Sequence, residues 1–450
     1  MHDLVVRNGT VVSPLSAQKL DIGIDGEAIA AIGHNLTGRR VIDASDMLVF
    51  PGVIDAHTHM DLSVRGIRSS DDFFTGTVAA AFGGVTSILD FTVGSPQTSI
   101  PLDIDRRLDD IRPAVIDVGL HAEVIGWKPE DSGQFAEARR RGVTSFKFYT
   151  AYEASGRRTP HAVMRRAFEH LADLGCVALV HCEDEDLIQS IMESLSPDQM
   201  EDMATLALAR PDLCEATAIS HVGHVAAETG CRIHIVHVSS AKGLISVQEA
   251  RRAGADVSAE TCPQYLVLAA DSYDRMDGAL FSASPALRTQ ADQTMLWRGL
   301  RDRNLDFVAT DHCPFTREQK AWKGSFVNLP YGLPGVETLL PILYSEGVGK
   351  GRLAVTDIPR LLCEGPARRY GLLGKKGALE VGFDADLVIF DPFFEWEISA
   401  PFLHMRTDFS PYEGWTVTGK PMTTIARGEL IVEDGELMAR EGRGTFLFRD

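Results

Sequence analysis

The sequence predicts an α/β fold: a (β/α)₈ TIM barrel together with a small β-domain that is built from both chain ends. Two patterns in the 450 residues support this prediction. Short apolar segments alternate with helical segments through the middle of the chain, which favours parallel strands joined by crossover helices. Short strands separated by turn residues occupy both ends. We therefore place the β-domain in residues 1–50 and 376–450, the latter with a tail, and the barrel in residues 51–375.

The β-domain is predicted from its turn signals. LVVRNGTVV has an Asn-Gly turn between β-branched runs, and DIGIDGEAIAAIG has an Asp-Gly turn in the same setting. Both dipeptides favour tight turns between short strands. ALEVGFDADLVIFDP and TTIARGELIVEDGELM repeat this punctuation near the carboxyl end, which indicates that the two ends form one small domain. Residues 400–450 either close this domain or bridge subunits.

The barrel is predicted from eight segments that read as buried parallel strands. They are LVFPGVIDAH (48–57), VTSILDFT (85–92), DVGLHAEVI (117–125), TSFKFYT (144–150), VALVHCE (177–183), RIHIVHV (232–238), DVSAETC (256–262) and LDFVATD (305–311). Eight such units predict a (β/α)₈ barrel, whose active site forms at the carboxyl ends of the strands.

Composition narrows the classes of partner and compartment. A hydrophobic content of 44% with 24% charged residues is typical of a globular protein with a sizeable core. Lys and Arg total 44 against 63 Asp and Glu, a net charge of −19, so nucleic acid and anionic membranes are poor partners. No stretch is apolar for long enough to cross a membrane, and the amino terminus lacks an apolar signal segment. Seven cysteines without a CxxC pair indicate a reducing cytoplasm.

Polar side chains occur at the carboxyl ends of five predicted strands. The first strand ends in HTH, and because residues i and i+2 share a face of a strand, His57 and His59 should point together into the barrel mouth. The fourth strand carries a lysine, the fifth and sixth end in histidines, and the eighth ends in an aspartate. These residues are Lys147, His181, His237 and Asp311.

Each of these residues also has a structural interpretation. His181 and His237 could be hydrogen-bonded core histidines, Asp311 a helix N-cap, and Lys147 a member of a buried ion pair. A buried polar group without a partner is costly, however, and five strand ends carrying metal-type ligands together are hard to explain structurally. The combination therefore predicts a metal centre.

Other histidines and cysteines are interpreted as structural. The spacing of three between His234 and His237 predicts that the two lie on opposite faces of the strand. His221 and His224 fall on a helical pattern, and His312 should point away from Asp311 while it could still line the site. Cys182 and Cys313 lack metal-site spacing and are interpreted as small packing residues.

The motifs together resemble a known family. HTHMD, the KxxxAY of Lys147 to Tyr152, VHCED, VHVSS and ATDHCPF are similar to motifs of the cyclic amidohydrolases, and among them of the dihydropyrimidinase and hydantoinase group. TCPQYL, SPALR, LPGVE and KKGALEVGFDADLVIFDP extend the resemblance over essentially the whole chain. The resemblance implies an amidohydrolase-type barrel whose chain ends form a small β-sandwich.

The resemblance also implies a centre of two divalent metal ions, usually zinc. Its ligands would be His57, His59 and Asp311 for the more buried ion, and His181 and His237 for the other. Lys147 would be carbamylated by carbon dioxide and bridge both ions, because a carbamate offers two oxygens whereas an ammonium cannot ligate a cation. This His and carboxylate set suits Zn²⁺ and would also accept Mn²⁺, Co²⁺ or Fe²⁺.

The reaction implied by the resemblance is ring opening of a cyclic amide to an N-carbamoyl amino acid. A hydroxide that bridges the metals would attack the ring carbonyl. Asp311 would act as general base and then as general acid toward the leaving nitrogen. Tyr152 would donate a hydrogen bond to the developing oxyanion; its alternative interpretation is a surface aromatic in a loop.

The substrate is narrowed but not fixed by three positions. Dihydroorotases usually have an arginine where this chain has Asp61, which argues against dihydroorotate. Ser284 matches a serine whose backbone grips the cyclic diamide in the family, whereas Tyr331 stands where the family commonly has Asn. A bulky phenol could reshape the pocket. Dihydropyrimidines, 5-substituted hydantoins and, next, allantoin or another cyclic amide therefore remain candidates.

A non-catalytic assembly protein is the alternative from a different class of function. Some relatives of dihydropyrimidinase are non-catalytic assembly proteins that have lost metal ligands, but here every ligand position is filled. The predicted partner is a small cyclic amide, and the resemblance implies a homotetramer, with a dimer as the alternative.

Overall fold

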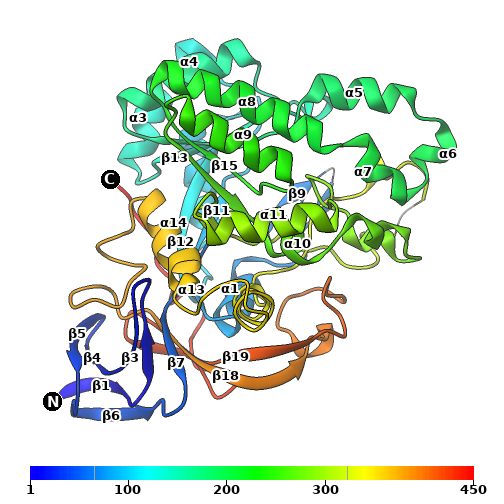
Figure 1. Ribbon diagram of the computed structural model, residues 1–450. Coiled ribbons are helices and arrows are strands. Elements are labelled where there is room, and N and C mark those ends of the chain that lie inside the picture. Colours follow the sequence, from blue (N-terminus) through cyan, green and yellow to red (C-terminus); the bar gives the residue numbers. More distant parts are fainter. Residues whose placement is uncertain (65, 322) are drawn as a thin grey trace.

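The computed structural model describes residues 1–64, 66–321 and 323–450. In Figure 1 helices surround the strands of a barrel in the upper part of the molecule. The blue start and the orange-to-red end of the chain form the sheets below it. Strands from the two ends of the sequence thus lie together beneath the barrel.

The described residues form an eight-stranded parallel sheet in which sequence neighbours are spatial neighbours. In order, the strands are β8 (Val53–Thr58), β11 (Val85–Phe91), β12 (Asp117–Glu123), β13 (Ser145–Tyr149), β14 (Val177–His181), β15 (Arg232–Ile235), β16 (Val257–Thr261) and β17 (Phe307–Val308). Thr58 forms a parallel bridge with His312, and the His59 N–H donates to the His312 carbonyl at 2.8 Å. These contacts join the first strand to the chain after the eighth, so the predicted (β/α)₈ barrel is confirmed.

Helices follow the barrel strands and cover their outer faces. They are α1 (Phe73–Phe82), α2 (Ile100–Asp110), α3 (Gly133–Arg140), α4 (His161–Asp173), α5 (Glu185–Ser194), α6 (Pro197–Met200), α7 (Leu206–Ala209), α8 (Asp212–Thr229), α9 (Ala241–Arg252), α10 (Pro263–Val267), α11 (Gln290–Arg301), α12 (Leu339–Leu343), α13 (Asp357–Pro359) and α14 (Gly365–Arg369). On α4 the buried residues Met164, Ala167, Phe168 and Leu171 follow helical spacing, which explains why this segment is helical and which face it buries. Among the described residues, no helix is both long and apolar enough to cross a membrane.

The barrel strands are buried on both faces, as expected for a parallel sheet that is covered by helices. Every residue of β11, VTSILDF, is buried. Leu89 and Phe91 pack inside the barrel with Leu179, whereas Ile88 packs outward in the main core. The alternation of side chains therefore divides each strand between a barrel interior and a helix-covered exterior.

Two further sheets combine the chain ends. One has the order β5 (Ala28–Gly33), β4 (Asp21–Asp25), β1 (His2–Arg7), β6 (Gly38–Asp43). The other has the order β21 (Glu436–Leu437), β20 (Glu429–Glu433), β19 (Thr416–Ala426), β18 (Leu387–Glu397), β7 (Leu48–Pro51), β2 (Thr10–Val12), β3 (Ala17–Lys19). Val6, Ile24 and Val49 share one core with Leu387 and Ile425, which is the sandwich that the sequence predicted. A short hairpin of β9 (Ser63–Val64) and β10 (Ile67–Arg68) lies apart from both.

The predicted first strand, 48–57, is two strands in different sheets. β7 pairs with β18 and β2, whereas β8 pairs with β11 in the barrel. Gly52 lies between them, and a Cβ at this residue would be only 2.1 Å from the Thr86 Oγ1 atom. The apolar run is continuous in sequence because the chain is buried on both sides of the junction, so hydrophobicity alone could not locate the break. The domain boundaries at residues 50 and 375 stay a prediction.

Part of the carboxyl-terminal segment follows the first alternative, that it closes the β-domain. Residues 416–437 do complete the seven-stranded sheet, but the tail then runs along the barrel strand β12. Phe446 bridges Val118, and Leu447 is buried within the barrel interior. The tail therefore covers the end of the barrel at which β12 begins.

Candidate metal centre and substrate site

Three of the predicted ligands, His57, His59 and Asp311, lie together at the carboxyl ends of the barrel strands. The Nε2 atoms of His57 and His59 are each 3.2 Å from Asp311 Oδ1. One ligand atom from each residue lies within 4.8 Å of the other two. β8 delivers the first histidine, and the chain after β17 delivers the aspartate, so barrel closure brings them together.

The environment of His57 fits a metal ligand. Its Nδ1 atom is 2.5 Å from Glu260 Oε1, and with Nδ1–H donated to that carboxyl group the lone pair lies on Nε2. Nε2 is buried and has no hydrogen-bond partner among the described residues. Burial, reinforced by the nearby Lys147 cation, lowers the pKa of His57 well below its ordinary value. A neutral imidazole aimed at a carboxylate is the donor set that a divalent cation requires.

His181 and His237 form a second pair beside the first. The Nδ1 atom of His181 is 3.0 Å from the Nε2 atom of His237. The His237 ring centroid lies 5.6 Å from that of His57, which connects the two sets. Burial lowers the pKa of both His181 and His237, so these imidazoles are also neutral.

Lys147 lies on the barrel interior between the two histidine sets. Its Nζ atom is 4.9 Å from the centroid of the Phe91 ring, and the side chain is buried. Burial lowers the pKa of Lys147 to about 8, although Asp311 and Glu260 oppose the shift. A neutral amine, the form that can react with carbon dioxide, is therefore accessible near neutral pH.

Tyr152 and Ser284 meet beside the second histidine pair. The two hydroxyl oxygens are 2.6 Å apart, and the ring centroids of Tyr152 and His181 are 4.9 Å apart. Burial raises the pKa of the Tyr152 phenol, which therefore remains protonated and can donate a hydrogen bond. The side chain is half-buried and contacts Ser284 and His181, so it is not a free surface aromatic.

Tyr331 belongs to the neighbouring loop. Its hydroxyl donates to the Phe326 carbonyl at 3.2 Å, and its ring packs against the main core. The next residue, Gly332, donates its N–H to the Ser282 carbonyl at 3.0 Å. The loops that carry Tyr331 and Ser284 are thus joined through their backbones.

The expectation that His234 and His237 lie on opposite strand faces is wrong. β15 ends at Ile235, and His237 has a φ of 41°, so strand alternation no longer applies there. His234 also faces the barrel interior, where its ring bonds Ser258 at 2.7 Å and Glu260 at 3.1 Å. Its hydrogen bonds nevertheless fit the structural role that was expected.

Three charged residues at the site were missed by the sequence reasoning. Glu260 bonds His57, and Glu183 bonds both His181 and Arg210. Glu260 could have been found, because a carboxyl group in the apolar segment DVSAETC is the same signal that singled out Lys147. Arg210 follows the short helix α7 and carries no periodicity or motif signal.

The remaining candidates lie where they were expected. His221 and His224 lie on α8, and Cys182 and Cys313 are buried. His312 points away from the ligands, with its Nε2 atom 3.1 Å from Asp71 Oδ2.

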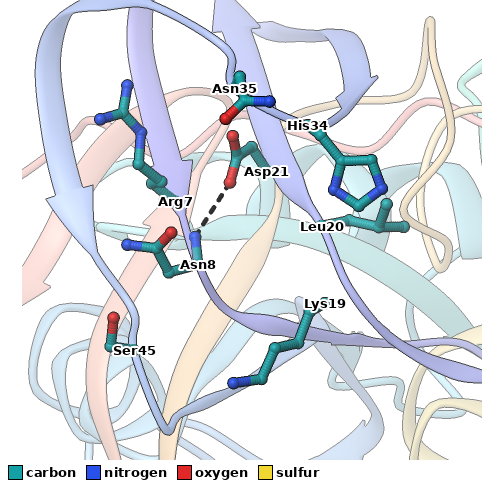
Figure 2. A pocket seen from close by; sticks show the side chains of 8 residues that line it. All are labelled: Arg7, Asn8, Lys19, Leu20, Asp21, His34, Asn35 and Ser45. Carbon is teal, nitrogen blue, oxygen red and sulfur yellow. Dashed lines mark hydrogen bonds between the residues drawn. The ribbon is translucent and has the colours of Figure 1, made fainter.

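A separate cavity of about 790 Å³ lies in the sandwich (Figure 2). It is lined by Arg7, Asn8, Lys19, Leu20, Asp21, His34, Asn35 and Ser45. The buried Asp21 carboxylate already accepts hydrogen bonds from the Asn8 and Leu36 N–H groups, each at 3.0 Å. Its lining belongs to the β-domain and includes no member of the histidine cluster, so we place the chemistry in the barrel.

Comparison with known proteins agrees with the fold. The amidohydrolase family model matches residues 48–431. The chain is 36% identical over 455 positions to the D-hydantoinase of Geobacillus stearothermophilus, covering 99% of this chain and 96% of that protein. It is 37% identical over 455 positions to the D-phenylhydantoinase of Escherichia coli O9:H4 strain HS, covering 99% and 98%. The crystal structure of dihydropyrimidinase from Brevibacillus agri NCHU1002 superposes with a TM-score of 0.96 at 34% identity, covering 99% and 98%.

The chain therefore belongs to the amidohydrolase family. The resemblance to the cyclic amidohydrolases that the motifs predicted is confirmed.

Proposed function

We propose that the protein is a metal-dependent hydrolase that opens the ring amide of a dihydropyrimidine or a 5-substituted hydantoin. Water adds to the ring carbonyl carbon, the C–N bond breaks, and the product is an N-carbamoyl amino acid. The observation that carries this proposal is the convergence of His57, His59 and Asp311 with the His181–His237 pair at one barrel mouth. The names of the relatives, hydantoinases and a dihydropyrimidinase, support the same reaction.

The cofactor would be two divalent metal ions, with Zn²⁺ as the first candidate because the donors are imidazole and carboxylate without thiolate. His57, His59 and Asp311 would hold the more buried ion, and the other histidine pair the second. Lys147, as a carbamate, would bridge them; its lowered pKa and buried position support this modification. When bound, such ions lower the pKa of water and polarise a carbonyl oxygen.

The chain's own residues would then move the proton and orient the substrate. Asp311 would accept the proton of the attacking water and return it to the leaving ring nitrogen. Tyr152, as a protonated phenol, would donate to the carbonyl oxygen as negative charge develops there. Backbone groups at Ser284 and Tyr331 would hold the cyclic diamide, since their loops are joined next to Tyr152.

The test is a substrate panel with the metal content measured on the same sample. Zinc-loaded protein is assayed with dihydrouracil, 5-phenylhydantoin, dihydroorotate and allantoin. Turnover of either of the first two supports the proposal. Turnover of allantoin alone would move the assignment to another cyclic amide, and protein that purifies without stoichiometric metal would favour the non-catalytic assembly class.

We further propose that the chain forms a homotetramer, or else a dimer, in the cytoplasm. β18 leaves Phe393 exposed over 76% of its surface, and Phe402 is 80% exposed. Large exposed apolar side chains favour burial in an assembly. Light scattering on the purified protein gives the oligomeric mass directly.

A further inference from the structure

Glu183 contacts both His181, a proposed metal ligand, and Ser284, which lies on the substrate side of the site. It lies two residues after the end of β14, and its side chain is fully buried. Thr150 holds its backbone, accepting from the Glu183 N–H at 2.9 Å and donating to the Glu183 carbonyl at 2.8 Å. Because Thr150 precedes the loop of Tyr152, the backbone of Glu183 is fixed to that loop.

The carboxylate of Glu183 selects which nitrogen of His181 can bind a metal. His181 Nε2 lies 3.0 Å from Glu183 Oε2. An Nε2–H donated to this carboxylate leaves the lone pair on Nδ1, which is the atom that faces His237. Arg210 donates to both oxygens of Glu183, so this carboxylate acts as an acceptor.

The same carboxylate oxygen also contacts the substrate side of the site. The Ser284 hydroxyl lies 3.0 Å from Glu183 Oε2 and 2.6 Å from the Tyr152 hydroxyl. With Ser284 donating to Glu183, its oxygen remains free to accept from Tyr152. The carboxylate thus sets the direction of the Ser284 hydrogen and places the Tyr152 phenol, whose single hydrogen would turn from Ser284 to the carbonyl oxygen when a substrate binds.

Arg210 holds Glu183 in place. Its guanidinium donates through Nε to Oε1 at 3.1 Å and through Nη2 to Oε2 at 2.5 Å, a two-point contact that fixes the carboxylate plane. The guanidinium carbon is also 5.4 Å from the centroid of the Tyr152 ring. The Arg210 carbonyl accepts from Arg288, which belongs to the same SPALR segment as Ser284.

We propose that Glu183, fixed by Arg210, is a positioning residue that couples the orientation of His181 to that of the Ser284–Tyr152 hydroxyl pair. One carboxylate then determines both the geometry of the second metal site and the donor that faces the substrate. The coupling rests on the proposed function, which gives these residues their roles. The effect of Glu183 on metal binding by His181 can nevertheless be measured without any substrate.

The experiment uses Glu183→Gln in the full chain. Glutamine has the same size but offers one oxygen to donors that now share two, and its NH₂ group would face Arg210. Cobalt is titrated into metal-stripped protein and followed by its absorption spectrum, since the same ligands accept Co²⁺. We expect one of the two cobalt ions to bind about 10–100-fold more weakly, with the other unchanged. We also expect KM to rise about tenfold for the substrate that the wild-type protein opens.

Two control variants separate coupling from general damage. Ser284→Ala leaves the His181–Glu183 contact intact, so it should raise KM without changing either cobalt affinity. Asp117→Asn removes a buried carboxylate that contacts Lys376 Nζ at 2.9 Å at the opposite end of the barrel, so it should lower stability alone. If Glu183→Gln does not fold, Arg210→Lys keeps the charge, loses the two-point contact, and should cause smaller shifts in the same two measurements.

Wild-type cobalt affinities and KM in folded Glu183→Gln would overturn the proposal. Weaker binding of one cobalt ion together with an unchanged KM would overturn the coupling as well. If the wild-type protein opens no ring in the panel while Glu183→Gln still weakens one cobalt ion, the proposed function fails and the link between Glu183 and His181 stands.

Discussion

Several proposed site residues have backbone conformations that L-residues seldom adopt. Tyr152, His237 and Asp311 have φ values of 71°, 41° and 54°. Such conformations cost about 1–3 kcal/mol and persist only where the surroundings hold them. After Asp311 this support comes from His312, whose backbone bridges both Thr58 and Leu333. The strained residues therefore lie just after the barrel strands, where the chain turns and the side chains come together at the site.

Replacement of Asp311 by asparagine tests its proposed role as the base. The asparagine side chain would keep an oxygen ligand, and this residue type also tolerates a left-handed backbone, so the protein should fold and retain most of its metal. Ring opening should fall by about 10²–10⁴-fold, because the amide cannot accept the proton. Metal content and turnover are measured on the same sample. Asp46→Asn is the matched control, since Asp46 is exposed and has a similar φ of 63°. Undiminished turnover in the Asp311 variant would remove the assigned base.

Lys147 should make the stability of the metal-stripped protein depend on pH. The unfolded lysine keeps its proton up to about pH 10.5, whereas the folded residue loses it near pH 8. Between these values the unfolded state binds more protons, so the free energy of unfolding rises with pH. The cost of the buried ammonium is fully present below pH 8.

Lys147→Met should remove that cost. In buffer free of carbon dioxide the variant should be more stable than the parent by about 3 kcal/mol below pH 8, with the difference closing toward pH 10.5. Urea unfolding of both proteins across this range gives the difference directly. A difference that does not change with pH would show that the folded lysine titrates normally.

At the scale of the elements, the proposed ligands at the strand ends could be predicted from the sequence, whereas the residues that hold them in place were harder to predict. His57 and His59 were predicted from strand alternation, and both reach the site although β8 shifts its register against β11 after Asp55 and ends at Thr58. The same rule failed at His237, since β15 had already ended. Arg210 could not be predicted, because its position depends on how the chain between α5 and α8 folds back, which no local pattern specifies. Sequence periodicity predicts regular strands and helices, whereas Arg210 and Glu183 contact each other from segments outside them.

The junction between β7 and β8 depends on Gly52. A Cβ there would lie 2.1 Å from Thr86 Oγ1 and 2.9 Å from the Asp386 Cβ atom. Gly52→Ala should therefore destabilise the protein by about 1–3 kcal/mol or more, measured by urea unfolding. Gly33→Ala is the matched control, because a Cβ on this strand glycine meets nothing within 4 Å. Equal effects of the two substitutions would contradict the close contact at the junction.

At the scale of the whole molecule, the sandwich and the last residues of the tail pack on the barrel at the end away from the ligands. The sandwich core draws residues from both termini, and the tail crosses the beginning of β12. Arg449 is buried there and donates to Ser145 Oγ at 2.9 Å. Turn signals predicted that the ends would form one domain, but the tail, GRGTFLFRD, has no periodicity that would place it against the barrel. The carboxyl ends of the strands carry the proposed site, whereas the opposite end of the barrel is filled by packed side chains.

This division predicts that damage to the tail lowers stability without changing the metal centre. Leu447 is 2% exposed inside the barrel, whereas Phe448 beside it is 57% exposed. Leu447→Ala should cost about 2–5 kcal/mol of unfolding free energy, because it leaves a cavity among packed side chains. Phe448→Ala, the matched control, should cost much less despite removing a larger side chain. Folded Leu447→Ala should still bind two metals with wild-type affinity, since the ligands lie at the other end of the strands. Loss of metal affinity in this variant would mean that the two ends of the barrel do not act independently.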